Sequence, residues 1–132
     1  MSISYSFEIL PDINAIICLY EKAEMPRPIN DTERMQKMFD NSNLIVTAWN
    51  NDKLVGVCRC LTDFEWCCYL SDLVVDNEFK KSGIGRKLVE LVKEKISDKC
   101  MILLLSVPTA MNYYPKIGFL KEDRAFLIPR KY

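Results

Sequence analysis

The chain has 132 residues, which suits one domain with one hydrophobic core. Hydrophobic residues make up 49% and charged residues 27%, as in ordinary soluble globular domains. Lysine plus arginine and aspartate plus glutamate both number 18, so the net charge is zero and gives no reason to expect a nucleic-acid partner. The sequence lacks a signal peptide pattern and the ~18 consecutive apolar residues of a membrane helix. We expect a single cytoplasmic domain over residues 1–132 with no membrane partner.

Six cysteines occur without any histidine, so a metal site needs separate consideration. The spacing Cys58-x-Cys60 puts both thiols on one face of a predicted strand, a pattern typical of buried free thiols. Paired CxxC ligand spacing is absent. We therefore expect no metal and no disulfide framework.

The first third of the chain predicts one strand and two helices. Apolar residues alternate with polar ones over residues 3–9, which indicates a half-buried strand. Asp12 is placed to cap a helix that reaches about Ala23. A second, short helix follows a proline-containing loop, and Asn30 with Glu33 has the spacing of a capping pair.

The middle of the chain predicts a β-hairpin over residues 44–61, with its turn at 50–53. A further strand ends in the β-branched run at residues 73–75. Apolar residues at steps of three and four then indicate a helix from Ile84 to Ile96.

The last third predicts a strand, a short helix and a final strand. Residues 101–107 form a continuous apolar run, as in a parallel strand buried on both faces. Residues 110–116 suit a short helix that Gly118 ends, and residues 119–128 suit an edge strand. The order β-α-α-β-β-β-α-β-α-β predicts an α/β (α+β) fold, in which helices flank both faces of a mixed sheet.

Two glycines, Gly83 and Gly85, stand where the strand at 73–75 leads through a loop into the helix. The first turn of a helix has unpaired N–H groups and the positive end of the helix dipole, so it favours phosphate. Lys80, Lys81 and neighbouring basic residues add positive charge. The loop lacks the GxxxxGK[ST] and full GxGxxG patterns, which disfavours a nucleotide enzyme.

The stretch LSDLVVDNEFKKSGIGRKL, followed by AMNYYPKIGF at residues 110–119, resembles the two signature motifs of the GNAT superfamily of N-acetyltransferases. The element order resembles that family over essentially the whole chain. Lys80 stands where the family usually has glutamine or arginine.

The resemblance implies acetyl-CoA as cosubstrate and no metal. The pantetheine arm would bond the strand that ends at residues 73–75 like an added strand, so that strand and the 101–107 strand must splay apart. The implied cofactor-binding residues are Leu73, Val74, Val75, Lys80, Lys81, Ser82, Gly83, Ile84, Gly85 and Arg86.

The implied reaction is direct transfer of acetyl to a primary amine in a ternary complex. By the resemblance, Tyr114 protonates the leaving thiolate. Because the chain has no histidine, carboxylates are the candidate bases: Asp72 first, as base or amine anchor, then Glu65 and Asp63. Alternatively, Asp72 is a strand residue that faces solvent or a neighbouring backbone. Tyr114 is alternatively an aromatic residue of the core.

The acceptor stays open between a small-molecule amine and a protein amine. Its pocket is expected near the helices of residues 13–39 and the turn at 62–68. A non-catalytic acyl-CoA-binding or regulatory module is the alternative function, and an exposed edge at residues 125–128 allows a homodimer. Candidate pocket residues, each also readable as core, are Met25, Met35, Met38, Trp49, Phe64 and Trp66.

Overall fold

The computed structural model describes residues 2–132 as a five-stranded sheet with three α-helices and three short 3-10 helices. Within these residues, no helix is long and apolar enough to cross a bilayer. The elements are β1 (Ile3–Ser6), α1 (Ile13–Lys22), α2 (Thr32–Asp40), β2 (Leu44–Asn50), β3 (Lys53–Thr62), β4 (Cys67–Val75), η1 (Asn77–Phe79), α3 (Ile84–Ile96), β5 (Met101–Leu103), η2 (Pro108–Ala110) and η3 (Tyr114–Ile117).

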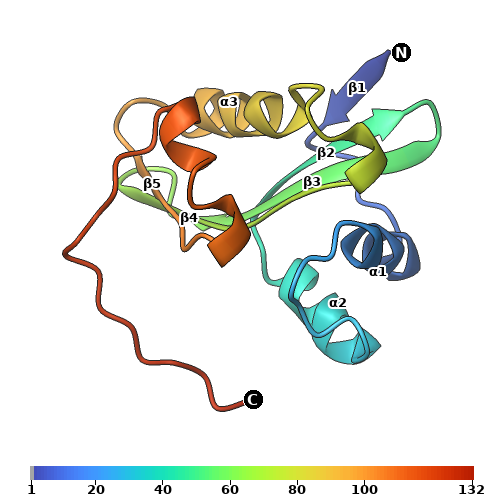
Figure 1. Cartoon of the computed structure of the whole chain (residues 1–132), viewed down its shortest axis with the longest axis horizontal. Coiled ribbons are helices and arrows are strands. Elements are labelled where there is room, and N and C mark those ends of the chain that lie inside the picture. Colours follow the sequence, from blue (N-terminus) through green and yellow to red (C-terminus); the bar gives the residue numbers. More distant parts are fainter. Residues whose placement is uncertain (1) are drawn as a thin grey trace.

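The strands lie in the order β1-β2-β3-β4-β5. The first four pair antiparallel, and β5 pairs parallel with β4. Helix α3 covers one face of the sheet, while α1 and α2 cover the other (Figure 1). The predicted mixed sheet with helices on both faces is confirmed.

Each face has its own hydrophobic core, because both layers of helices turn an apolar stripe to the sheet. On the α3 side, Leu88 and Val92 pack against Val46 and Cys58. On the other side, Ile16 and Phe39 belong to the cluster that joins α1 and α2 to the sheet. The two layers therefore hold β4 between them.

Aspartate side chains cap the N-termini of α1 and α2, and one of the two caps differs from the prediction. Asp12 caps α1 as predicted, since its carboxylate accepts from the Ala15 N–H at 3.0 Å. The prediction of Asn30 as the cap of α2 is wrong. Asp31 is the cap and accepts from the Arg34 N–H at 3.0 Å. A carboxylate at the cap also interacts favourably with the helix dipole.

The strand predicted over residues 101–107 is shorter in the structure. Only Met101–Leu103 pairs with β4, opposite Cys67–Tyr69. The remaining residues of the run leave the sheet, and β4 continues to Val75 without β5 beside it. The splaying of these two strands that the resemblance required is therefore present.

The final strand predicted over residues 119–128 is absent, and this prediction is wrong. The short helix predicted at 110–116 is replaced by η2 and η3, with Gly118 ending η3 at a φ of 102°. Residues after Phe119 carry neither helix nor strand and run away from the sheet (Figure 1, red). A strand needs a partner for its backbone groups, and this segment meets none in its own chain.

Candidate functional site

The start of α3 presents backbone donors without a capping side chain. Gly83 is the N-cap, has a φ of 84° and makes no side-chain cap bond. Lys81, two residues earlier, also has a positive φ, of 67°. Lys80, Lys81 and Arg86 have exposed side chains. Exposed cations around an uncapped helix start favour binding of a phosphate group.

The two signature motifs of the sequence contact each other at this helix start. The Arg86 guanidinium donates to the Lys116 carbonyl oxygen at 2.9 Å. A Cβ added at Gly85 would lie 2.8 Å from the Tyr113 hydroxyl oxygen and 3.8 Å from Val75 Cγ2. A larger residue at position 85 would therefore have to displace the Tyr113 hydroxyl.

β4 has a free edge next to the start of α3. The Asp76 N–H donates to the Val55 carbonyl of β3 at 2.9 Å. In an antiparallel ladder every second residue turns its N–H and C=O toward the partner, so Val74 also uses the β3 side. Leu73 and Val75 consequently direct their backbone groups to the opposite edge. Among the described residues no strand pairs with that part of β4, which leaves it open to an extended ligand.

Asp72 is fully buried and accepts four hydrogen bonds. Its Oδ2 accepts from the Tyr20 hydroxyl and from Arg59 Nε, both at 2.7 Å. Its Oδ1 accepts from Arg27 Nε at 2.7 Å and from the Ser71 hydroxyl at 3.3 Å. The carboxylate thereby joins α1, the loop after α1, β3 and β4.

The same two arginines hold the residue at which β4 changes direction. The pairing of β3 with β4 shifts between Arg59 and Cys60, so Ser71 is an extra residue in β4. Arg27 donates to the Ser71 carbonyl at 2.7 Å, and Arg59 to its hydroxyl at 2.8 Å. Such a bulge bends and twists a strand, and this one lies just beyond the last β4–β5 pair.

The geometry does not favour Asp72 as a general base. Burial opposes its ionisation, but the hydrogen bonds and charges of Arg59 and Arg27, with Tyr20, outweigh this and lower its pKa. A carboxylate with a lowered pKa and both oxygens occupied is a weak proton acceptor. The structure gives Asp72 the place of a positioning residue for the β4 bulge.

The turn carboxylates also lie far from the free edge of β4. Asp63 accepts from the N–H groups of Glu65, Trp66 and Cys67 at 2.8 to 3.1 Å, and the hydrogen bonds from Trp66 and Cys67 lead in lowering its pKa. The turn that carries Asp63 and Glu65 precedes Cys67, at the end of β4 opposite to Leu73 and Val75. The structure therefore does not favour these carboxylates as bases at that edge.

Tyr114 is half-buried in η3. Its ring packs edge-on against Tyr113 and Phe119, with centroids 5.4 and 5.5 Å apart. Burial, followed by nearby Cys58 and Tyr113, raises the pKa of Tyr114 to about 12. The phenol is therefore protonated at neutral pH and has a proton to donate.

The six cysteines are free thiols, of which Cys18 and Cys67 are exposed. Hydrogen bonding from Cys60, followed by burial, raises the pKa of Cys68, so its thiol is a poor nucleophile. Within residues 2–132 no group of three or more potential metal ligands comes together.

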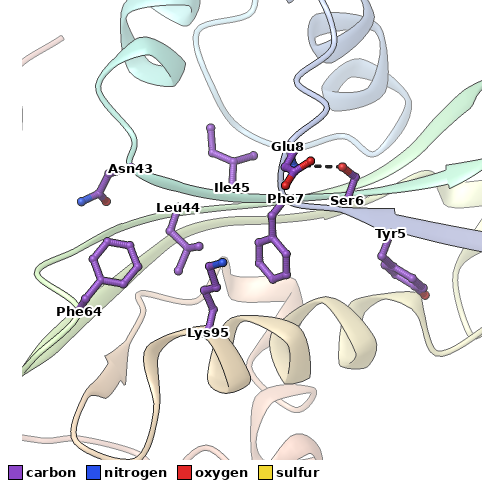
Figure 2. Close-up of a pocket in the computed structure, with 9 residues that line it drawn as sticks. All are labelled: Tyr5, Ser6, Phe7, Glu8, Asn43, Leu44, Ile45, Phe64 and Lys95. Atoms are coloured by element: carbon purple, nitrogen blue, oxygen red, sulfur yellow. Dashed lines mark hydrogen bonds between the residues drawn. The ribbon is translucent and has the colours of Figure 1, made fainter.

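The residues expected to form an acceptor pocket do not share one place. Met35 is fully buried in the core, whereas the Trp66 side chain is 75% exposed. A hollow of about 440 Å³ instead lies between β1, β2 and the end of α3, where Lys95 lies over the Phe7 ring at 5.2 Å (Figure 2). Lys95 is twelve residues from Gly83, about 18 Å along α3 at 1.5 Å per residue, so this hollow is separate from the cofactor residues.

The fold and the two contacting signature motifs are those of an acetyltransferase domain. Residues 15–127 match the Acetyltransferase (GNAT) domain family, and the chain belongs to that family. It is 25% identical over 119 residues to an uncharacterised N-acetyltransferase, ycf52, of Pyropia yezoensis, covering 83% of this chain and 68% of the relative. It is also 25% identical over 99 residues to GCN5-related N-acetyltransferase 1, chloroplastic, of Arabidopsis thaliana, covering 72% of this chain and half of the relative.

Solved structures agree on the fold. A probable acetyltransferase of unknown function from meticillin-resistant Staphylococcus aureus superposes with a TM-score of 0.84 at 20% identity, over 99% of this chain and 100% of that one. At these identities the likeness concerns the fold. It nevertheless includes the whole described sheet and its helices.

Sequence reasoning missed Arg27, Arg59 and Tyr113. A signal existed for Arg59, because it stands between the buried Cys58 and Cys60 in a strand of apolar residues. A buried arginine requires an acceptor nearby, and Asp72 is its direct partner on the neighbouring strand. Nothing comparable in the sequence pointed to Arg27 or to the contact between Tyr113 and Gly85.

Proposed function

We propose that this protein is an N-acetyltransferase that transfers the acetyl group of acetyl-CoA directly to a primary amine. Membership in the GNAT family supports acyl transfer from acetyl-CoA. The observation that carries the proposal for this chain is the pair of unpartnered backbone surfaces: the uncapped start of α3 and the adjoining free edge of β4.

The residues present fit acetyl-CoA. The N–H groups from Lys81 to Arg86 would hold the pyrophosphate, because Gly83 leaves them uncapped. The backbone of Leu73 and Val75 would bond the pantetheine arm as an added strand. A side chain at position 85 would displace Tyr113, so glycine there keeps the helix start accessible.

Bound acetyl-CoA supplies an activated thioester, and attack by a neutral amine forms the amide C–N bond and breaks the C–S bond. The sulfur leaves with the electron pair of the C–S bond, and the Tyr114 hydroxyl donates a hydrogen bond to it. Because the pKa of Tyr114, about 12, lies above the reference value of a thiol, about 8.5, the phenol stabilises the developing thiolate mainly through this hydrogen bond. Asp72 has no free oxygen to accept the proton of the amine, so water is the proposed acceptor.

The test is thiol release from acetyl-CoA in the presence of a panel of primary amines: small polar amines, arylalkylamines, polyamines and peptides with free N-termini. Amine-dependent release, with matching acetylated product, is the expected result. Tight binding of acetyl-CoA with no release for any amine would instead support a non-catalytic acyl-CoA-binding module.

A further inference from the structure

The hollow of about 440 Å³ beside the end of α3 forms where β1 leaves β2. The last pair of these strands is Ser6 with Thr47, so within the described chain residues 44–46 of β2 have no β1 partner. The Ser6 hydroxyl accepts from the Glu8 N–H at 3.0 Å and from the Ile9 N–H at 2.9 Å, which turns the chain away from the sheet. The end of α3 and the turn between β3 and β4 complete the walls (Figure 2).

Aromatic side chains line the α3 side of this hollow. Figure 2 shows Phe7 and Phe64 on opposite sides of Leu44, with Tyr5 beyond Phe7. Phe7 is 37% exposed and Phe64 40%, whereas Leu44 is buried. Among the residues that the structure describes, neither Phe7 nor Phe64 belongs to the two core clusters. Their rings are therefore available to an aromatic ligand.

The backbone of Phe64 is strained. Its φ of 65° lies in the left-handed region, which a bulky aromatic residue rarely adopts. The turn holds it there, because Thr62 Oγ1 accepts from the Phe64 N–H at 3.0 Å and the Asp63 carboxylate accepts from the next three N–H groups. The Asn43 amide fixes Thr62 in turn, donating to its carbonyl at 2.6 Å and accepting from its N–H at 3.0 Å. Strain that core packing does not explain is typical of ligand sites.

Lys95 gives the aromatic side of the hollow a positive charge. Its ammonium lies 5.2 Å from the centroid of the Phe7 ring and makes no ion pair with another described residue. Glu8 is the other charged residue of the lining, and Figure 2 shows it on the opposite side of β2 from Lys95. A carboxylate placed at Lys95 therefore meets a cation and no fixed anion.

We propose that this hollow binds a small aromatic carboxylate. The ring of the ligand lies over Leu44 between Phe7 and Phe64, and its carboxylate accepts from the Lys95 ammonium. A volume of about 440 Å³ is within the range of small-molecule sites. A neutral aromatic ligand would leave the charge of Lys95 unused, and an inorganic anion would leave the rings unused. The hollow is separate from the start of α3, so the inference does not depend on the proposed acetyltransferase function.

The first test is an NMR titration of the isotope-labelled protein with phenylacetate. The amide signals of Phe7, Leu44 and Lys95 should shift saturably, with a dissociation constant of about 1 mM or below, as expected for a ligand of this size. The signals of Gly83 and Gly85 should not move. Phenylacetamide, which has the same shape without the charge, should bind roughly fivefold more weakly. A short peptide that ends in phenylalanine should bind no more tightly than phenylacetate.

The second test removes the charge of the site. Lys95→Gln should weaken the binding of phenylacetate roughly fivefold and leave the binding of phenylacetamide unchanged. Lys93→Gln is the matched control, because Lys93 also lies in the last turn of α3 but does not line the hollow. It should bind both compounds as the native protein does.

The third test separates binding by Phe64 from packing. Phe64→Asn removes the ring and places a residue that tolerates a positive φ, so phenylacetate affinity should fall roughly fivefold while the unfolding midpoint is retained. Trp66→Asn is the control, since Trp66 is an exposed aromatic residue of the same turn that does not line the hollow. It should leave phenylacetate affinity unchanged.

Four results would overturn the proposal. The first is the absence of saturable shifts at the hollow, and the second is equal affinity for phenylacetate and phenylacetamide. The third is tighter binding by the peptide, which would make the hollow a docking surface for a protein segment. The fourth is a large loss of stability in Phe64→Asn with unchanged phenylacetate affinity, which would make the ring a packing element.

Discussion

The hydrogen-bond network around the buried Asp72 and the start of α3 both lie next to β4. In the first, the polar groups are bonded within the protein, whereas in the second they have no capping partner. At Asp72 the two carboxylate oxygens accept four hydrogen bonds from groups of the protein itself. At the start of α3, Gly83 provides no cap, and Lys80 and Lys81 are exposed. The first region is complete without a ligand, and the second is not.

This difference indicates that the Asp72 network stabilises the fold and that the start of α3 is suited to binding a ligand. Buried charges with full partners contribute to folding and specificity, and they are costly to disturb. Unpartnered donors at a helix start are available to a ligand at little structural cost. A carboxylate that lies close in sequence to the proposed cofactor-binding strand is thus not identified as a general base by its position alone.

The largest expected effect comes from Asp72→Asn. The substitution keeps the shape but leaves Arg59 and Arg27 without their counter-charge, so it should lower the free energy of unfolding by about 3–5 kcal/mol. Denaturant unfolding measures this. Glu122→Gln is the matched control, since Glu122 also pairs with an arginine, Arg124, but at the surface, and it should leave the unfolding midpoint unchanged.

Normal stability of Asp72→Asn together with lost turnover would contradict this account. It would return Asp72 to the role of catalytic base.

The free energy of unfolding should also fall at acidic pH, because Asp72 becomes protonated. Its folded-state pKa is lowered, so its contribution is fully present above the unfolded-state pKa, about 3.9, and is lost as pH falls from there through the folded-state value. Thermal unfolding between neutral and strongly acidic pH should show a steeper acid loss for the native protein than for Asp72→Asn. Parallel curves for the two proteins would contradict the assignment.

The next effect concerns Tyr114→Phe, which removes the hydroxyl and keeps the ring packing. We expect turnover to fall about 100-fold, the usual size of a general acid contribution, with little change in acetyl-CoA affinity. Because the pKa of Tyr114 is raised to about 12, rate profiles of the native enzyme should show no loss from tyrosine ionisation below about pH 10. Unchanged turnover would leave Tyr114 a packing residue.

A smaller effect, on acetyl-CoA binding, should distinguish Gly85 from Gly83. Gly85→Ala should weaken acetyl-CoA binding by about 1 kcal/mol, or roughly fivefold, because its Cβ displaces the Tyr113 hydroxyl. Adding Tyr113→Phe should restore affinity, since the next ring atom, Cζ, is 3.6 Å away. Titration calorimetry on the two single variants and the double variant measures the coupling.

Gly83→Ala is the control for that cycle. No atom lies within 4 Å of its added Cβ, so its cost comes only from the positive φ. Tyr113→Phe should therefore not rescue it. Equal rescue of both glycine variants would contradict the steric explanation.

Local patterns in the sequence predicted most of the fold. Helix α3 lies over Ile84–Ile96 as its apolar spacing indicated, and Gly118 ends η3 as proposed. The splaying of β4 from the chain after β5 was expected from the family resemblance. These features depend on periodicity, capping and glycine conformation, which neighbouring residues determine.

Features that depend on distant partners were less predictable. The edge strand expected after Phe119 has suitable side chains but meets no partner strand within its own chain. Asp72 received its role from Arg27 and Arg59, which are 45 and 13 residues away. Sequence spacing alone does not show whether such a residue is catalytic or structural.

The central claim is that the start of α3 binds acetyl-CoA, and titration calorimetry with acetyl-CoA tests it most directly. The native protein should bind acetyl-CoA and not ATP, and Gly85→Val should weaken binding strongly. Gly118→Ala, at a glycine outside the start of α3, serves as the control and should bind normally. Absence of acetyl-CoA binding, or equal binding by Gly85→Val, would contradict the account.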